Sequence, residues 1–256
     1  MKYVKALILI CLISQSGYPK DFVRNLPDAK MCQILTTENF KNSDAVVVLK
    51  EQSLLIEDNE IYYHGVEIKG PGITRNFIMI VKLFNEVAVK RYGSFEYNYR
   101  EYYGNEFPNS FEAGARVLKE TGDIVVMSEN HVHVKVSREA NDGTPLARKV
   151  LFKVTDLSAG DILQVEYTFT QVLSQSTSGI FFYNSSDPVL FSNLYITLPR
   201  KCETKYFCFP QEKIGDPQIL QVSKNYGAGN TYFWSVRNLN SIPTEPFQSR
   251  LQINPI

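Results

Sequence analysis

An excess of charge of either sign is missing from this sequence: 27 Lys and Arg balance 27 Asp and Glu, for a formal net charge of +0 at pH 7. Proteins that bind nucleic acid without sequence preference use a basic excess to neutralise phosphates. The balance excludes that class of binder, and we expect no nucleic-acid partner.

Long hydrophobic runs are also missing. The apolar run from Ala6 to Ile13 is roughly 8 residues, far short of the ~20 that a membrane-spanning helix needs. It follows Lys2 and Lys5 and precedes the small residues Ser14 and Ser16, a pattern typical of a cleaved secretory signal. We therefore predict a signal peptide over 1–16, export to the periplasm or cell surface, and no membrane span after its removal.

Cysteine is scarce, with 4 residues in 256, and Cys11 lies inside the predicted signal. The other three are far too few for a disulfide scaffold, so an apolar core must supply most of the stability. Cys202 and Cys208 are close in sequence, which predicts that they pair in an oxidising compartment and that Cys32 stays free.

Recognisable catalytic motifs are absent as well. The sequence has no Gly-x-Ser-x-Gly elbow, no His-Glu-x-x-His pair and no glycine-rich phosphate loop. A cysteine nucleophile needs an activated thiolate beside a base, and no cysteine has a histidine near it in a matching motif. We expect no catalytic residue, no cofactor and no enzymatic activity.

A metal site is the alternative use of the histidines. His131 and His133 would point to the same face of a strand and could hold zinc or copper, but only His64 and scattered carboxylates offer further ligands. The other interpretation is a half-exposed pair on a strand. Without ligand spacing around them, we expect no metal.

What the chain does contain is a succession of short runs rich in Val, Ile, Tyr, Phe and Thr, separated by Gly, Asn, Asp or Pro. The stretch from Leu163 to Phe169 alternates apolar and polar residues after a turn at Ala159-Gly160-Asp161, which predicts a half-buried strand. The other predicted strands are 45–49, 61–68, 78–84, 95–99, 115–118, 124–127, 132–136, 150–154, 181–183, 190–198 and 231–236. Hairpin turns are predicted at 58–59, 121–123 and 141–143. The pattern predicts an all-β fold, an antiparallel β-sandwich over 44–242.

The two flanking segments differ from this body. A leader over 17–43 contains one segment, Asp28 to Leu35 after Pro27, that predicts a short helix. The tail over 243–256 carries Pro243, Pro246 and Pro255, which favour an extended chain rather than another central strand.

Several residues are expected to hold the sandwich together. Asp161 can accept backbone hydrogen bonds beside Gly160, and Pro188 can set the start of a strand. Trp234 alternates inward with its neighbours. The full set of predicted structural residues is Asp44, Gly160, Asp161, Tyr167, Pro188 and Trp234.

Aromatic residues are densest from Tyr92 to Phe107. Phe95, Tyr97 and Tyr99 share one face of a predicted strand. If that face is exposed, the rings could stack on a sugar or peptide. The alternative is that the face packs into the core of the protein. Tyr102 and Tyr103 stand beside Gly104 in a predicted loop and are the better binding candidates.

Taken in order, these segments resemble the domain of unknown function 3857, a β-rich module that precedes a transglutaminase-like domain in exported proteins of Gram-negative bacteria. The segments that carry the resemblance are Asp44–Glu51, Lys82–Glu86, Ala115–Asp123, Val154–Tyr167, Asp187–Pro199, Tyr232–Leu239 and Glu245–Phe247.

The resemblance implies a non-catalytic accessory or interaction module of the cell envelope, whose partner is a transglutaminase-like domain or another envelope protein. It places the catalytic Cys-His-Asp site in the following domain, so no catalytic residue carries over. Two alternatives stay open: a surface module that binds glycan or peptide through Tyr99, Tyr102 and Tyr103, and a fragment of a transglutaminase-like cysteine protease that lacks its catalytic domain.

Overall fold

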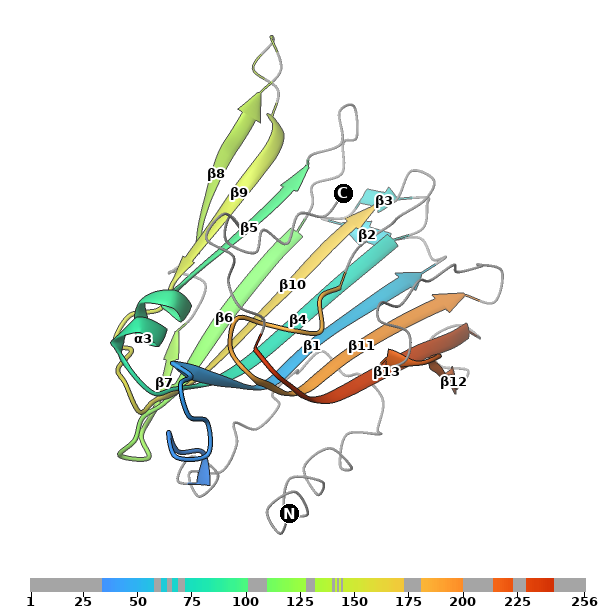
Figure 1. Ribbon diagram of the computed structural model, residues 1–256. Coiled ribbons are helices and arrows are strands. Elements are labelled where there is room, and N and C mark those ends of the chain that lie inside the picture. Colours follow the sequence, from blue (N-terminus) through green and yellow to red (C-terminus); the bar gives the residue numbers. More distant parts are fainter. Residues whose placement is uncertain are drawn as a thin grey trace.

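The computed structural model describes residues 34–57, 61–63, 66–68, 72–100, 110–127, 132–139, 141, 143, 145–172, 181–199, 214–222 and 229–241. Most of these residues are in strands, and an eight-stranded mixed sheet packs against a three-stranded sheet (Figure 1). The predicted two-layer all-β fold is confirmed. The predicted signal peptide, residues 28–33 of the predicted leading helix and the proline-containing tail lie outside the described residues.

The larger sheet contains eight strands, and a further short hairpin stands apart from it. In chain order the strands of the large sheet are β1 (Ala45–Glu57), β4 (Gly72–Leu83), β6 (Ser110–Leu118), β7 (Ile124–Met127), β10 (Ile162–Val172), β11 (Val189–Pro199), β12 (Gln218–Val222) and β13 (Gly229–Leu239). The hairpin is formed by β2 (Ile61–Tyr63) and β3 (Val66–Ile68). The three-stranded sheet contains β5 (Ser94–Arg100), β8 (Val132–Glu139) and β9 (Pro145–Lys153), and the helix that is described in full is α3 (Glu86–Tyr92).

Strand order in the large sheet is β12-β13-β11-β1-β4-β10-β6-β7, and every neighbouring pair is antiparallel except β1 and β11. Parallel neighbours start at the same edge of a sheet and need a long connection between them. The starts of β1 and β11 therefore meet at one edge, together with the end of β4, which runs antiparallel to β1. This edge carries the polar cluster described below.

Both faces of the large sheet are buried near that edge. The strand register places Val117, Leu163, Val81 and Val47 side by side, and this row packs against the three-stranded sheet and α3. The opposite face, which includes Ile80, is covered by Leu35 and Phe40. Burial on both faces explains why β4 contains a continuous apolar run, Phe77 to Val81, rather than an alternating one.

The small sheet closes the core with aromatic rings. Tyr97 and Tyr99 of β5 pack on Phe169 of β10, with ring centroids 5.5 and 4.9 Å apart. At its free edge β8 is exposed along most of its length. No helix among the described residues is long and apolar enough to cross a membrane.

The structure differs from the sequence-based expectations in four places. The predicted strand 61–68 is instead the hairpin of β2 and β3. Residues 181–183 are irregular, because this segment crosses the face of the large sheet rather than joining its ladder (Figure 1). Strand β12 and helix α3 were not predicted from the sequence.

Candidate functional site

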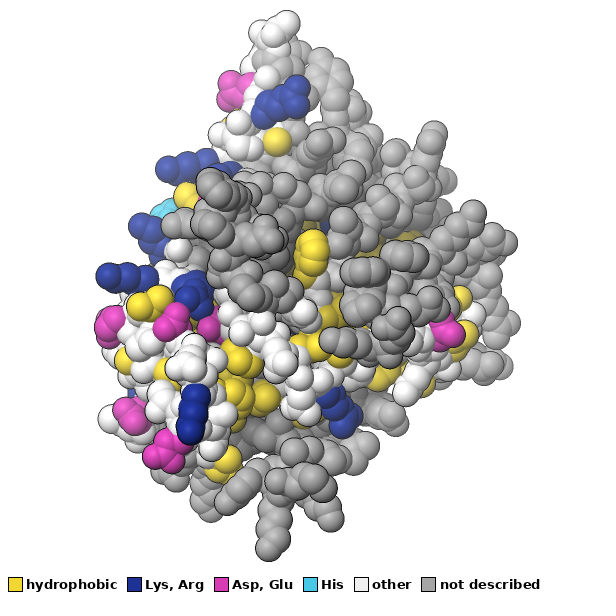
Figure 2. Space-filling model, in the orientation of Figure 1, with side chains coloured by type: hydrophobic (Ala, Val, Ile, Leu, Met, Phe, Trp, Pro, Cys, Tyr) yellow, Lys and Arg dark blue, Asp and Glu magenta, His cyan; other side chains and the backbone are white. Residues whose placement is uncertain are grey.

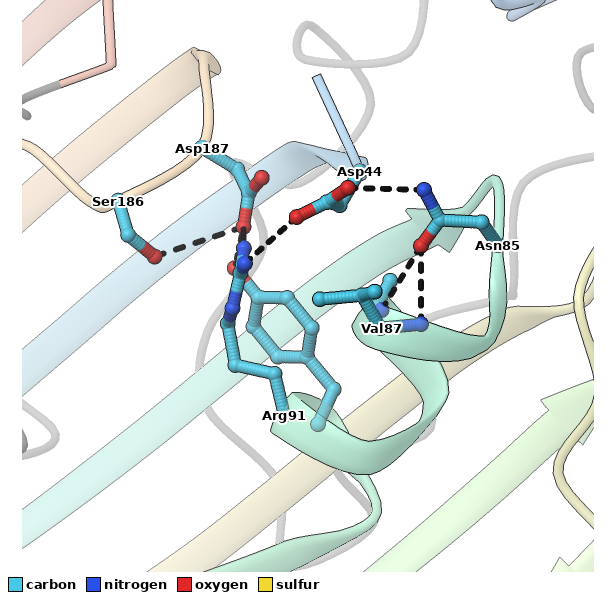
Figure 3. A network of polar contacts seen from close by, with 8 residues as sticks. Asp44, Asn85, Val87, Arg91, Ser186 and Asp187 are labelled. Carbon is cyan, nitrogen blue, oxygen red and sulfur yellow. Dashed lines mark hydrogen bonds and ion pairs between the residues drawn. The ribbon is translucent and has the colours of Figure 1, made fainter. Parts of the chain in front are cut away.

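A polar cluster fills the edge of the large sheet where β1 and β11 begin, and we call it the α3 clamp. It comprises Asp44, Asn85, Arg91, Tyr92, Ser186 and Asp187 (Figure 3). Asp44 immediately precedes β1 and Asp187 lies just before β11, so the parallel pairing of these strands brings both carboxylates to one place. Helix α3 follows β4 at the same edge and supplies the other partners.

The side chain of Asn85 sets the position of α3. Its Oδ1 accepts hydrogen bonds from the backbone N–H groups of Val87 and Ala88 at 3.0 and 3.1 Å. This is an N-cap, which satisfies backbone donors that have no partner inside the helix. The Asn85 Nδ2 donates to Asp44 Oδ1 at 2.8 Å, so the cap also connects the helix to the start of β1.

The guanidinium of Arg91 joins the two carboxylates. Its Nη2 lies 2.7 Å from Asp44 Oδ2 and its Nη1 lies 2.6 Å from Asp187 Oδ2. The Tyr92 hydroxyl donates to the same Asp187 oxygen at 2.8 Å. The Asp187 side chain is only 3% exposed, whereas those of Arg91 and Asp44 are each 34% exposed. The clamp thus has a buried acid at its centre and a solvent-facing rim.

The contacts of the clamp shift the pKa values of Asp44, Arg91 and Tyr92. The Asn85 hydrogen bond, followed by the Arg91 charge, lowers the pKa of Asp44 despite some desolvation. Burial acts to lower the pKa of Arg91, but Asp187 and Asp44 outweigh it and the pKa is raised. Burial and the Asp187 charge raise the pKa of Tyr92, which therefore stays protonated as a donor at neutral pH. The arrangement is suited to holding structural elements together.

A second cluster lies at the same edge, in the turn that leads into β10. Asp161 is buried, and its Oδ2 accepts from the Ser158 backbone N–H at 2.8 Å and from Lys119 Nζ at 2.9 Å. Gly160 has a φ of +92°, a conformation that side chains with a Cβ rarely adopt. Its N–H donates to the Leu83 carbonyl at 2.9 Å, which fixes the turn against the end of β4.

The other predicted structural residues are distributed over the core. The Pro188 carbonyl accepts a hydrogen bond from the Val47 N–H at 2.9 Å, at the junction of β11 with β1. The Tyr167 ring stacks on Phe77, with centroids 5.1 Å apart. Trp234 is 3% exposed and lies on the inner side of β13. Each of these residues packs where two elements meet.

Of the three predicted binding residues, Tyr99, Tyr102 and Tyr103, only Tyr99 is among the described residues. Tyr99 is 6% exposed and belongs to the aromatic core, which is the alternative to a binding role. Tyr102, Tyr103, Cys202 and Cys208 lie outside the described residues.

The histidines do not form a metal site in the part of the chain that the structure describes. His133 is exposed on β8, and His64 and His131 are not among the described residues. Across the described ranges no group of three potential His, Cys, Asp or Glu ligands could hold a metal ion.

Sequence reasoning missed the clamp residues Asn85, Arg91 and Tyr92. A signal was available: Asn85 and Glu86 precede an apolar stretch that ends in Lys90, Arg91 and Gly93, which is typical of the start and stop of a helix. Nothing in the sequence indicated that this helix would lie beside Asp44 and Asp187, because that proximity follows from the parallel strand pair.

Comparisons with solved structures found a likeness that is informative about the fold. It is a protein from Parabacteroides distasonis described as a "putative protease", with a TM-score of 0.56 and 15% identity over 82% of this chain. The match covers 38% of the Parabacteroides chain, so this chain spans well under half of that protein's length. At this identity the likeness establishes the fold alone.

Two further structures were matched at lower similarity, and neither carries an argument. One is a CBM3a-L domain with flanking linkers from a scaffoldin of the Clostridium thermocellum cellulosome, with a TM-score of 0.26, 12% identity, and coverage of 53% of this chain and 79% of that one. The other is a "putative nutrient binding protein" from Legionella pneumophila, with a TM-score of 0.32, 8% identity, and coverage of 77% and 64%.

No curated protein matches the chain in sequence. Residues 73–243 match the family described as a domain of unknown function with a solved structure, DUF3857. This match extends over more than half of the 256 residues and includes α3, the turn at Gly160 and the strands β4 to β13. The chain therefore belongs to the DUF3857 family.

Proposed function

We propose that this protein is an exported, non-catalytic β-sandwich module of the bacterial cell envelope that works together with a transglutaminase-like domain or another envelope protein. The proposal rests on the resemblance of its sequence segments to modules of that kind and on the character of its polar residues. The amino-terminal pattern of Lys2 and Lys5 followed by an apolar run supports export.

The observation that carries the proposal is that the α3 clamp satisfies its own polar groups. The Asp187 carboxylate is bound by Arg91 and Tyr92, and Asp44 is bound by Arg91 and Asn85. A nucleophilic or acid–base site needs a group poised next to a partner that can take its proton. The clamp contains no thiol and no histidine, and its one arginine is already shared by two acids.

The surface of the described residues supports binding to a protein better than binding to a polyanion. Among the described residues, side chains of both signs of charge are visible around α3 (Figure 2). Edge strands of the large sheet carry exposed apolar side chains, among them Val126 on β7 and Ile219 on β12. Such edges are positions where another chain can add to a sheet.

A second candidate function is favoured by the fold likeness. The Parabacteroides protein is more than twice as long as the region that this chain covers, and it is described as a protease. The corresponding proposal is that this chain is the β-rich part of a transglutaminase-like cysteine protease. Sequencing of the transcript past the Ile256 codon separates the two: an adjoining catalytic domain supports the second.

The first proposal is tested in a Gram-negative host that expresses the full chain with a photo-crosslinking amino acid at Val126 or, in a second variant, at Ile219. Both sites are exposed on edge strands, and the matched control position is Val117, which is buried in the core. We expect an envelope-localised chain processed near Ser16 and a crosslink from at least one edge to a transglutaminase-like or other envelope protein. Cytoplasmic retention with residues 1–16 intact, or no crosslink from either edge, would contradict it.

A further inference from the structure

Lys50 occupies an unusual place on the inner face of the large sheet. It lies on β1. An irregular segment, residues 181–187, crosses the sheet before β11, and we call it the strap (Figure 1). The Lys50 Nζ donates to the Asn184 carbonyl at 3.1 Å and lies 5.6 Å from the centroid of the Phe181 ring. The amine is therefore held between the sheet and the strap.

Lys50 has no acidic partner among the described residues. Its Nζ donates to the Asn184 carbonyl, and Asp187 at the far end of the strap is bound to Arg91 and Tyr92. Buried lysines are ordinarily paired with a carboxylate, because an unpaired ammonium loses its hydration without compensation. Here burial lowers the pKa of Lys50 to about 8, so a much larger neutral fraction is present at neutral pH than for an exposed lysine.

The buried hydroxyl of Ser192 lies near Lys50 and has no hydrogen-bond partner among the described residues. Ser192 of β11 is the register neighbour of Lys50 in the parallel pair, so both side chains leave the sheet on the same side. Ser192 is 0% exposed, and its Oγ has no hydrogen-bond partner in the structure. Buried hydroxyls are nearly always hydrogen-bonded, so an unsatisfied one beside a half-buried lysine needs an explanation.

We propose that Lys50 and Ser192 form a covalent capture site for small aldehydes, with Lys50 as the nucleophile. The neutral Lys50 amine attacks the carbonyl carbon to give a carbinolamine, which then loses water. The C=O bond of the aldehyde is replaced by a C=N bond, its oxygen leaves as water with the two amine protons, and no oxidant or other reactant is required.

The surroundings of Lys50 favour this chemistry over that of an ordinary surface lysine. The Ser192 hydroxyl can donate to the carbinolamine oxygen, and the Phe181 ring offers a flat apolar surface to a planar aldehyde. Lysines with a lowered pKa in apolar surroundings are the ones that form such adducts with carbonyl compounds. The alternative is that Lys50 has a structural role only and holds the strap against the sheet. The labelling experiment below distinguishes a capture site from this structural role.

The test uses the whole mature chain with benzaldehyde and cyanoborohydride at pH 7, which converts the imine into a stable benzylamine. Peptide mapping then gives the labelling rate of each lysine. We expect Lys50 to be labelled at least about tenfold faster than the exposed Lys90 and Lys135, since far more of its amine is neutral at this pH. Its labelling rate should rise with pH and level off above about 8, where the rates of Lys90 and Lys135 still increase.

Two variants complete the test. Lys50→Arg keeps the positive charge and should abolish the fast adduct while leaving the rates of Lys90 and Lys135 unchanged. Ser192→Ala should slow Lys50 labelling several-fold without affecting those two. Should Lys50→Arg fail to fold, the per-lysine rates of the unmodified chain still decide: labelling of Lys50 no faster than that of Lys135 overturns the proposal and leaves Lys50 as a strap anchor. The proposed envelope function does not depend on this result.

Discussion

Asp44 and Asp187 bind the same guanidinium although they are far apart in sequence: Arg91 lies 2.7 Å from one carboxylate and 2.6 Å from the other. Each aspartate stands just before one strand of the parallel pair β1 and β11. A single arginine thus bridges two acids that the parallel pairing places side by side. The clamp fixes the start of both strands and the end of α3 with one side chain.

Removal of the Arg91 charge should destabilise the fold. Arg91→Met keeps much of the aliphatic stem but leaves Asp187, 3% exposed, without a cation. We expect the free energy of unfolding to fall by about 1–3 kcal/mol. This loss is at or below that caused by breaking a fully buried ion pair, because the Arg91 side chain is partly exposed. Urea unfolding measures it. Asp44→Asn is the control and should cost under ~1 kcal/mol, since Asp44 is 34% exposed. Equal losses in the two variants would contradict this account of the clamp.

The hydroxyl of Tyr92 should contribute separately. Tyr92→Phe removes one hydrogen bond to the buried Asp187 carboxylate, and we expect a loss of about 1–2 kcal/mol. Tyr167→Phe is a matched control, because this ring also packs in the core but its hydroxyl has no hydrogen-bond partner among the described residues. Both variants are measured by urea unfolding. A shift of the unfolding midpoint for Tyr167→Phe as large as that for Tyr92→Phe would show that the hydrogen bond from Tyr92 to Asp187 does not stabilise the fold.

The turn before β10 should depend on glycine at position 160. Gly160→Ala places a Cβ at φ +92°, within 2.8 Å of Glu120 Oε2, in a turn already held by the bond to Leu83. We expect the free energy of unfolding to fall by about 1–2 kcal/mol, as measured by thermal unfolding. Gly122 has a similar φ of +96° with open space around it, so Gly122→Ala reports backbone strain alone. A smaller loss for Gly160→Ala than for Gly122→Ala would be inconsistent with a rigid turn.

Glu166 on β10 should make stability depend on pH. Burial raises the pKa of Glu166, with partial compensation from Arg116 and Gln164. A carboxyl whose folded pKa exceeds its unfolded value binds its proton more tightly in the native state, so stability falls as pH rises through that range. Glu166→Gln should therefore raise the melting temperature at pH 7, and the gain should vanish below about pH 4. Glu112→Gln, at an exposed position on the neighbouring strand, should show no such gain. A lower melting temperature for Glu166→Gln at pH 7 would refute this assignment.

The strands could be predicted from the sequence because their cause is local. Alternation of apolar and polar residues from Leu163 to Phe169 and the continuous apolar run in β4 both reflect burial, and each is visible within a few residues. The pairing of β1 with β11 could not be predicted in this way. It joins residues more than 130 positions apart, and no local pattern records whether two strands run parallel.

For the clamp, too, the local structure could be predicted from the sequence, whereas the contacts between distant segments could not. The helix signal around Asn85 is present in the sequence, yet Arg91 and Asp187 meet only because the fold brings α3 to the start of β11. Tyr99 was a candidate for binding because its face of β5 is aromatic, but that face turns inward onto Phe169. The alternation was predicted correctly, whereas the side of the strand that faces solvent depends on which sheet packs above it.

The central proposal is that this chain is not itself an enzyme, and the most direct measurement of it is turnover by the purified mature protein. Peptide hydrolysis and amine incorporation into a glutamine-containing peptide are followed at near-neutral pH, alongside the rate at which iodoacetamide modifies each cysteine. The account predicts no turnover above the buffer control and cysteine rates no faster than that of a free thiol. Turnover that is lost in step with rapid modification of one cysteine, and that is abolished by alanine at Cys32, Cys202 or Cys208, would contradict it.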